Sequence, residues 1–127
     1  MPISINHAAL FVKDLEGART FYETYFDAVA NELYHNPRTG LRTYFLTFGG
    51  VCRLEIMERP DVQEPPTAGE TGWNHVAFSL GSAEAVDHLV ERLRADGFTA
   101  SDPRTTGDGY YESVVLDREG NSIEITI

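Results

Sequence analysis

The sequence predicts an α+β fold made of two βαβββ halves that follow one another along the chain. Asn6-His7-Ala8-Ala9 is matched in the second half by Asn74-His75-Val76-Ala77, and Leu54-Glu55-Ile56 is matched by Ile123-Glu124-Ile125. The spacing from His to Glu differs by only one residue between the two copies, which indicates an internal repeat. Each half also shows one strand pattern, one helical pattern and then further strand patterns. Two copies of one unit are therefore expected.

The first half begins with β-branched and apolar residues from Ile3 to Val12, which predict a strand. Asp14 offers an N-cap for a helix with apolar residues at Leu15, Ala18, Tyr22 and Tyr25. Three more strands are predicted at Val29–Tyr34, Leu41–Phe48 and Val51–Met57. Turn residues from Asn36 to Gly40 and the pair Gly49-Gly50 separate these strands. His35 is expected in a turn, next to Asn36-Pro37, and Cys52 is expected as a small core residue.

The second half repeats this order after a segment rich in proline, glycine and acidic residues. Module one is predicted at residues 1–58, a surface linker at 59–72 and module two at 73–127. Trp73 to Leu80 predicts a strand, Ser82 an N-cap, and Gly97 a left-handed helix end. The helix between them has apolar residues at Ala83, Val86, Val90 and Leu93, with His88 on its polar side. The last strands are predicted at Phe98–Ala100, Tyr110–Leu116 and Asn121–Ile127.

Size and charge restrict the possible functions. A chain of 127 residues fits a single domain with a sizeable core. Its formal net charge of −10 opposes binding to nucleic acid or to an anionic membrane surface. No apolar run approaches the ~20 residues of a membrane span, and the N-terminus lacks the pattern of a signal peptide. A cytoplasmic protein with a small-molecule partner is expected, and the single cysteine, Cys52, suits a reducing compartment.

Strand alternation indicates where the repeated His and Glu residues point. His7 shares a strand face with Ile5, Ala9 and Phe11, whereas the opposite face is purely apolar and suits the helix. Glu55 and Glu124 likewise alternate with apolar residues that suit the helix side. For His75 both faces contain apolar residues, so alternation leaves its direction open. At least three of the four side chains are expected on the face away from the helices.

Two histidines and two carboxylates form a ligand set that divalent Ni, Zn, Co, Mn or Fe accepts. A carboxylate between two apolar strand residues also needs a cation, a hydrogen-bonding partner or a proton. A single strand histidine or glutamate is more often structural, but recurrence at matched positions favours a shared metal site formed by His7, Glu55, His75 and Glu124. Such a site keeps open positions for substrate oxygens and suits enolate chemistry, with one glutamate, Glu55 or Glu124, as general base.

The residues resemble the vicinal oxygen chelate superfamily, which includes glyoxalase I, bleomycin-resistance proteins, extradiol dioxygenases and methylmalonyl-CoA epimerase. The resemblance covers the whole chain, residues 1–127, as one domain. It is most specific at four segments: residues 6–12, Phe21-Tyr22, residues 74–78 and residues 116–124. It implies that the two modules form an open, curved β-barrel-like sheet around the metal, with the helices outside and the ligands at the four positions named above.

The full His-Glu-His-Glu set is similar to that of glyoxalase I, a lactoylglutathione lyase that acts on a methylglyoxal-thiol hemithioacetal through a metal-stabilised enediolate. The resemblance implies that Glu124 is the base and that a homodimer has its sites near the subunit interface. Phe11 stands where glyoxalase I usually has a basic residue for glutathione, which leaves the substrate open. Substrate-pocket candidates are Phe11, Phe48, Arg53 and Tyr110. The alternatives are a binding protein that sequesters a small molecule, an epimerase and an Fe(II) dioxygenase.

Overall fold

The computed structural model describes residues 5–62, 73–107 and 109–127. The chain divides into two units, Met1–Pro66 and Thr67–Ile127, and each unit contains one helix and one mixed sheet. The predicted α+β class is confirmed. Most of the linker predicted at 59–72 lies outside the described residues.

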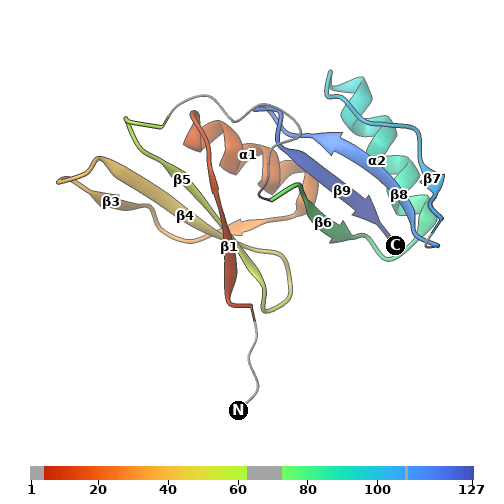
Figure 1. Cartoon of the computed structure of the whole chain (residues 1–127), viewed down its shortest axis with the longest axis horizontal. Coiled ribbons are helices and arrows are strands. Elements are labelled where there is room, and N and C mark those ends of the chain that lie inside the picture. The colour runs from red at the N-terminus through yellow and green to blue at the C-terminus, as the bar shows by residue number, and fades with distance from the viewer. Residues whose placement is uncertain (1–4, 63–72, 108) are drawn as a thin grey trace, which may run out of the picture. The chain divides into compact units, whose positions relative to one another are not determined.

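The first unit is a five-stranded sheet with one helix, α1 (Figure 1). The strand order is β1-β5-β4-β2, and β3 also pairs with β4. Strand β1 runs parallel to β5, whereas the other pairs are antiparallel. The elements are β1 (His7–Phe11), α1 (Leu15–Phe26), β2 (Val29–Ala30), β3 (Tyr34–Asn36), β4 (Leu41–Thr47) and β5 (Arg53–Glu58).

The second unit has a four-stranded sheet in the order β6-β9-β8-β7, again with its first strand parallel to its last. Its elements are β6 (Val76–Ser79), α2 (Ala83–Ala95), β7 (Arg104–Thr105), β8 (Tyr111–Leu116) and β9 (Ser122–Thr126). His7 begins β1 and His75 directly precedes β6, so in both units the repeated His lies at the start of the strand that pairs with the Glu-bearing strand.

Both helix starts follow the predicted caps. The Asp14 carboxylate accepts a hydrogen bond from the Gly17 N–H at 3.0 Å, and the Ser82 hydroxyl oxygen accepts one from the Ala85 N–H at 3.1 Å. Gly97 ends α2 with a φ of +90°, a conformation that glycine adopts without a steric penalty. The caps set where each helix begins, and the spacing of the apolar residues sets which face it turns to its sheet.

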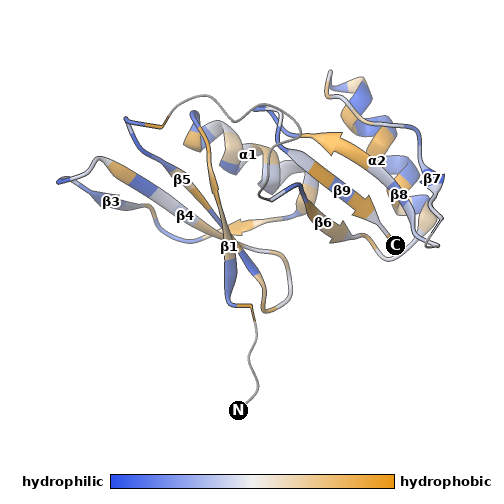
Figure 2. Cartoon of the chain, in the orientation of Figure 1, coloured by the Kyte–Doolittle hydropathy of each residue, from blue (hydrophilic) through white to orange (hydrophobic). Residues whose placement is uncertain are grey.

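Each helix packs on one face of the sheet in its own unit, α1 against β4 and β5, and α2 against β8 and β9. The side chains between α1 and its sheet include Leu15, Leu46 and Ile56, all with 0% exposure. Figure 2 shows both hydrophobic and hydrophilic residues around α2, as expected for a helix with one buried face. The alternate residues of β5 and β9 are left on the other face of each sheet.

Truncating a core side chain tests this packing. Ile125 is completely buried on the helix side of β9, so Ile125→Ala is expected to lower the free energy of unfolding by about 2–5 kcal/mol, measured by urea-induced unfolding. The control is Ile127→Ala two residues away, because Ile127 is 52% exposed and its truncation leaves no cavity. Equal losses in the two variants would contradict this description of the core.

The expected position of Cys52 is wrong. Cys52 precedes β5 and is exposed, and its neighbour Val51 is 91% exposed. The reason is that the turn after Gly49-Gly50 extends further than predicted, so that pairing with β4 begins only at Arg53. The apolar pattern from Val51 onward therefore overstated the length of the strand.

Other differences between the predicted and the observed strands involve short strands. His35 lies in β3 instead of a turn, because Tyr34–Asn36 pairs with the start of β4 across the turn at residues 37–40. The strand predicted at Phe98–Ala100 is reduced to a single bridge between Ala100 and Val115. Pro103 follows this bridge and has no N–H to donate, and pairing with β8 resumes only at β7.

Trp73, which was predicted to begin a strand, is 99% exposed and lies before β6. Of the first predicted strand, Ile3 and Ser4 lie outside the described residues, and the described residues form β1 from His7 to Phe11. Within the described residues, neither helix is long and apolar enough to cross a membrane.

Candidate metal centre

In the first unit the fold brings together His7 of β1 and Glu55 of β5. The His7 Nε2 atom lies 3.6 Å from Glu55 Oε1, and the side chains are 36% and 16% exposed. Parallel pairing places Ala9 opposite Glu55 and His7 opposite Arg53. All of these residues lie on one face of the sheet, opposite the face with the buried residues Leu54 and Ile56.

The second unit repeats this arrangement with His75 and Glu124. The His75 Nε2 atom lies 3.1 Å from Glu124 Oε2, and the side chains are 34% and 22% exposed. Ala77 lies opposite Glu124 in the parallel pairing of β6 and β9, and His75 precedes Ala77 by two residues. His75 therefore lies on the Glu124 face, which strand alternation in the sequence left open.

An asparagine next to each histidine fixes the orientation of the imidazole. His7 Nδ1 lies 2.8 Å from Asn6 Oδ1, and His75 Nδ1 lies 2.8 Å from Asn74 Oδ1. Because an amide oxygen only accepts hydrogen bonds, the tautomer with a proton on Nδ1 satisfies both contacts. The Nε2 atom of each ring is then left to face a carboxylate oxygen. Neither asparagine is among the predicted site residues, although both copies of the repeat contain one directly before the histidine.

This geometry fits a divalent cation. A neutral imidazole Nε2 and a carboxylate oxygen are both electron-pair donors, so their close approach calls for a proton or a metal ion between them. Imidazole nitrogen and carboxylate oxygen are both ligands of first-row divalent metals, and an Nδ1–H held by an oxygen is the usual outer contact of a metal-binding histidine. Within each unit the described residues bring together two such donors, with no third His, Cys, Asp or Glu beside them.

Phe45 and Arg53 lie beside the first pair. Phe45 is opposite Glu55 in the pairing of β4 with β5, and its ring centroid lies 5.1 Å from that of His7 in an edge-to-face arrangement. The Arg53 guanidinium carbon lies 4.4 Å from the Phe45 ring centroid, and Arg53 Nη2 donates to Asn6 Oδ1 at 2.7 Å. Phe45 and Asn6 were not among the predicted pocket residues.

The other predicted pocket residues differ in their placement. Phe11 lies on the same face of β1 as His7 and is 40% exposed, with the Arg59 guanidinium 5.2 Å from its ring centroid. Tyr110 precedes β8 and is 56% exposed. Phe48 has its ring 6.5 Å from that of Tyr22 on α1, so it lies with the core on the helix side. Phe48 is therefore not one of the residues of the proposed pocket.

Two tyrosines bond to the helices instead of the candidate site. Tyr44 donates its hydroxyl to Glu16 at 2.6 Å, and Tyr111 donates to Asp87 at 2.5 Å. Each hydrogen bond to a carboxylate raises the pKa of the tyrosine hydroxyl, and burial raises it further. Both hydroxyls therefore stay protonated near neutral pH and connect the sheets to α1 and α2.

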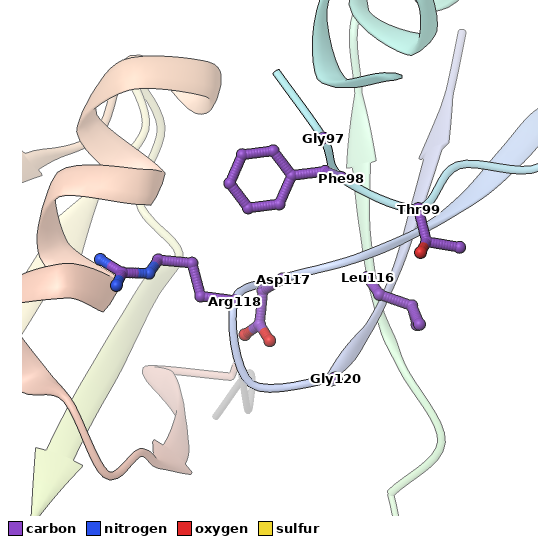
Figure 3. A pocket seen from close by; sticks show the side chains of 7 residues that line it. All are labelled: Gly97, Phe98, Thr99, Leu116, Asp117, Arg118 and Gly120. Atoms are coloured by element: carbon purple, nitrogen blue, oxygen red, sulfur yellow. The ribbon is translucent and has the colours of Figure 1, made fainter. Parts of the chain in front are cut away.

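The second unit also contains an open hollow of about 340 Å³ beside the turn between β8 and β9 (Figure 3). It is lined by Gly97, Phe98, Thr99, Leu116, Asp117, Arg118 and Gly120, none of which is a predicted site residue. Asp117 accepts hydrogen bonds from the N–H groups of Glu119 and Asn121 and from the Asn121 amide. Its carboxylate is thus used to hold the turn in place.

Comparison with known proteins finds a family that matches almost the whole chain. The family described as the Glyoxalase/Bleomycin resistance protein/Dioxygenase superfamily matches residues 4–125. The fosfomycin resistance protein FosX of Listeria innocua is 32% identical over 115 residues, which cover 87% of this chain and 77% of FosX.

Solved structures show the same fold. The glyoxylase/bleomycin resistance protein/dioxygenase domain from Frankia sp. EAN1pec is similar with a TM-score of 0.86, at 18% identity, over 100% of this chain and 98% of that chain. A variant of FosX from Listeria monocytogenes, in complex with Mn(II) and 1S,2S-dihydroxypropylphosphonic acid, has a TM-score of 0.73 at 24% identity, over 99% of this chain and 93% of that chain. The chain belongs to the Glyoxalase/Bleomycin resistance protein/Dioxygenase superfamily.

Proposed function

We propose that this protein is a metal-dependent lyase or isomerase of the glyoxalase type, which acts on a small substrate with two neighbouring oxygen atoms. His7, Glu55, His75 and Glu124 hold one divalent cation, drawn from Ni, Zn, Co, Mn or Fe. The observation that carries this proposal is the repeated geometry, in which each imidazole Nε2 faces a carboxylate oxygen while Nδ1 is held by an asparagine. The presence of this contact in both copies of the repeat supports the same role for the two histidines.

The bound cation supplies positive charge that stabilises negative charge developing on the substrate oxygens. The residues of the chain perform the proton transfer. Glu124 accepts a proton from the substrate carbon and returns it to the neighbouring carbon, so the reaction is an isomerisation without net oxidation. Asn6 and Asn74 keep the two imidazoles in the orientation that leaves Nε2 free for the cation.

Removing one of these asparagines tests the outer contact. Asn74→Ala is expected to weaken the affinity for a divalent metal about 10–100-fold, because the His75 ring loses the acceptor that fixes its tautomer. Calorimetric titration with Mn(II) or Ni(II) measures this change. The control is Asn121→Ala, which removes an amide that bonds to Asp117 in the turn after β8. An equal loss of affinity in both variants would mean that Asn74 acts only through folding.

The proposed function is tested in two steps. Elemental analysis of protein purified without chelator is expected to find about one divalent metal for each set of four ligands. The metal-loaded protein is then assayed with methylglyoxal and a panel of thiols, including glutathione. A metal-free protein that binds an aromatic ligand tightly without turnover would support the sequestering alternative and contradict the enzyme proposal. Aerobic ring cleavage with Fe(II), or epimerisation of a CoA thioester, would replace the glyoxalase assignment.

A second candidate is modification of fosfomycin, which is favoured by the relationship to FosX from Listeria innocua at 32% identity. The FosX structure with Mn(II) and a dihydroxypropylphosphonic acid also contains a ligand with neighbouring hydroxyl groups. Phosphorus NMR of fosfomycin incubated with the Mn(II)-loaded protein tests this candidate. A new resonance at the position of dihydroxypropylphosphonate supports it, and an unchanged spectrum removes it.

We also propose a cytoplasmic homodimer whose sites lie near the subunit interface. The two His–Glu pairs of one site then come either from a single chain or one from each chain of the dimer. Light scattering measures the mass of the particle. Mixing a His7→Ala chain with a His75→Ala chain then separates the two arrangements, because recovery of metal binding requires pairs from different subunits.

A further inference from the structure

Arg53 occupies a distinctive place beside the first His–Glu pair. It precedes Glu55 by two residues on β5 and therefore shares its face, and it lies opposite His7 on β1 and Thr47 on β4. The side chain is only partly exposed. A guanidinium is always charged, so its position on this face places a permanent positive charge beside the candidate metal ligands.

The contacts of Arg53 leave most of its donors unused. One N–H bonds to the neutral Asn6 oxygen, and the guanidinium lies over the Phe45 ring. By contrast Arg19, Arg42 and Arg59 of the same unit all pair with carboxylates. Among the described residues no carboxylate pairs with Arg53. Its fork of N–H donors is held in one orientation by Asn6 and Phe45, which favours binding of a planar or tetrahedral anion.

The second unit has no positive charge at the position that matches Arg53. Glu124 matches Glu55, and the residue two positions before Glu124 is Ser122, which is neutral. At this matched position, a positive charge is present in the first unit and absent from the second. The chain as a whole carries a formal charge of −10, which repels anions in general. An anionic ligand would consequently depend on a specific local cation.

We propose that Arg53 binds an anionic group of the substrate, a phosphonate, phosphate or carboxylate, next to the oxygens that the metal holds. This inference rests on the proposed function, because it takes the His7–Glu55 pair as part of the active site. It names the substrate class as small anions with neighbouring oxygens. Arg53 thereby acts as a specificity-determining residue.

The experiment titrates the metal-loaded full-length protein with methylphosphonate by calorimetry, because this probe carries the anion without the rest of a substrate. Arg53→Gln is expected to weaken methylphosphonate binding at least about 10-fold, since it removes a charge-assisted hydrogen bond. Arg53→Lys keeps the charge without the fork and is expected to retain part of the binding. The matched control is Arg38→Gln, which removes an exposed arginine from the turn before β4.

Metal affinity is measured in the same samples, so that a loss of methylphosphonate binding is separated from a loss of metal, and Arg38→Gln is expected to bind metal as the unmodified protein does. Equal methylphosphonate binding by the unmodified protein, Arg53→Gln and Arg53→Lys overturns the proposal. So does an equal loss in Arg38→Gln, which indicates general surface charge. If the protein binds metal but not methylphosphonate, only the role of Arg53 is wrong. If methylphosphonate binding depends on Arg53 but the protein shows neither metal binding nor turnover, the proposed function is wrong.

Discussion

Replacement of Glu124 by glutamine (Glu124→Gln) is expected to lower kcat by about 10²–10⁴-fold, the usual contribution of a positioned general base. Glutamine has nearly the same size and keeps an oxygen that can face His75, but its amide does not accept a proton near neutral pH. The measurement is steady-state kinetics with the substrate found in the activity screen. Metal content is determined in parallel. Loss of a general base lowers kcat without loss of metal, whereas loss of a ligand also lowers the metal content.

The control is Glu91→Gln, because Glu91 is exposed on α2 and lies far along the chain from either repeated Glu. Its kcat is expected to be unchanged. If Glu124→Gln retains full turnover while Glu55→Gln loses it, the base is Glu55 and the assignment of the two carboxylates is reversed. Unchanged turnover in both variants would remove the repeated glutamates from proton transfer altogether.

The second large effect is expected for His75→Ala, which removes an imidazole that lies 3.1 Å from Glu124. Loss of a direct ligand is expected to weaken divalent metal affinity by more than about 100-fold, beyond the range for outer contacts. His7→Ala is expected to have an effect of the same size, because the two pairs play equivalent parts in the proposed centre. Calorimetric titration with Mn(II) or Ni(II) measures both changes without any assay of activity.

The chain offers a matched histidine control in each unit. His88 is exposed on α2 and His35 is exposed on β3, so His88→Ala and His35→Ala remove an imidazole away from the candidate centre. Both are expected to bind metal as the unmodified protein does. If His7→Ala and His75→Ala also keep full metal affinity, the metal binds elsewhere and the proposed ligand set is wrong.

The repeat made much of this fold accessible from the sequence. Two similar halves constrain each other, so the order of strands and helix recognised in one half supports the same order in the other. Helix starts at Asp14 and Ser82 were predictable because capping depends on a residue and its next three neighbours. The burial of Leu15, Val86 and Leu93 followed from helical spacing in the same way.

Features that depend on the exact extent of strand pairing were harder to predict. Cys52 shares an apolar pattern with true strand residues, yet it is exposed because its partner strand has already turned away. β3 and β7 are so short that their own residues carry little periodic signal, and each exists because it can pair with a longer neighbour. Strand boundaries are thus decided by the partner strand as much as by the local sequence.

For the candidate centre, too, some features could be predicted from the sequence and others could not. The sequence by itself determined which residue types recur at matched positions, His7 with Glu55 and His75 with Glu124, since a duplication is visible without coordinates. Only the tertiary structure decided that each His lies against its own Glu, because parallel pairing of β1 with β5 and of β6 with β9 joins residues far apart in the chain. It also decided which atoms Asn6, Asn74 and Arg53 contact, because side-chain directions follow from packing and hydrogen bonding and not from spacing.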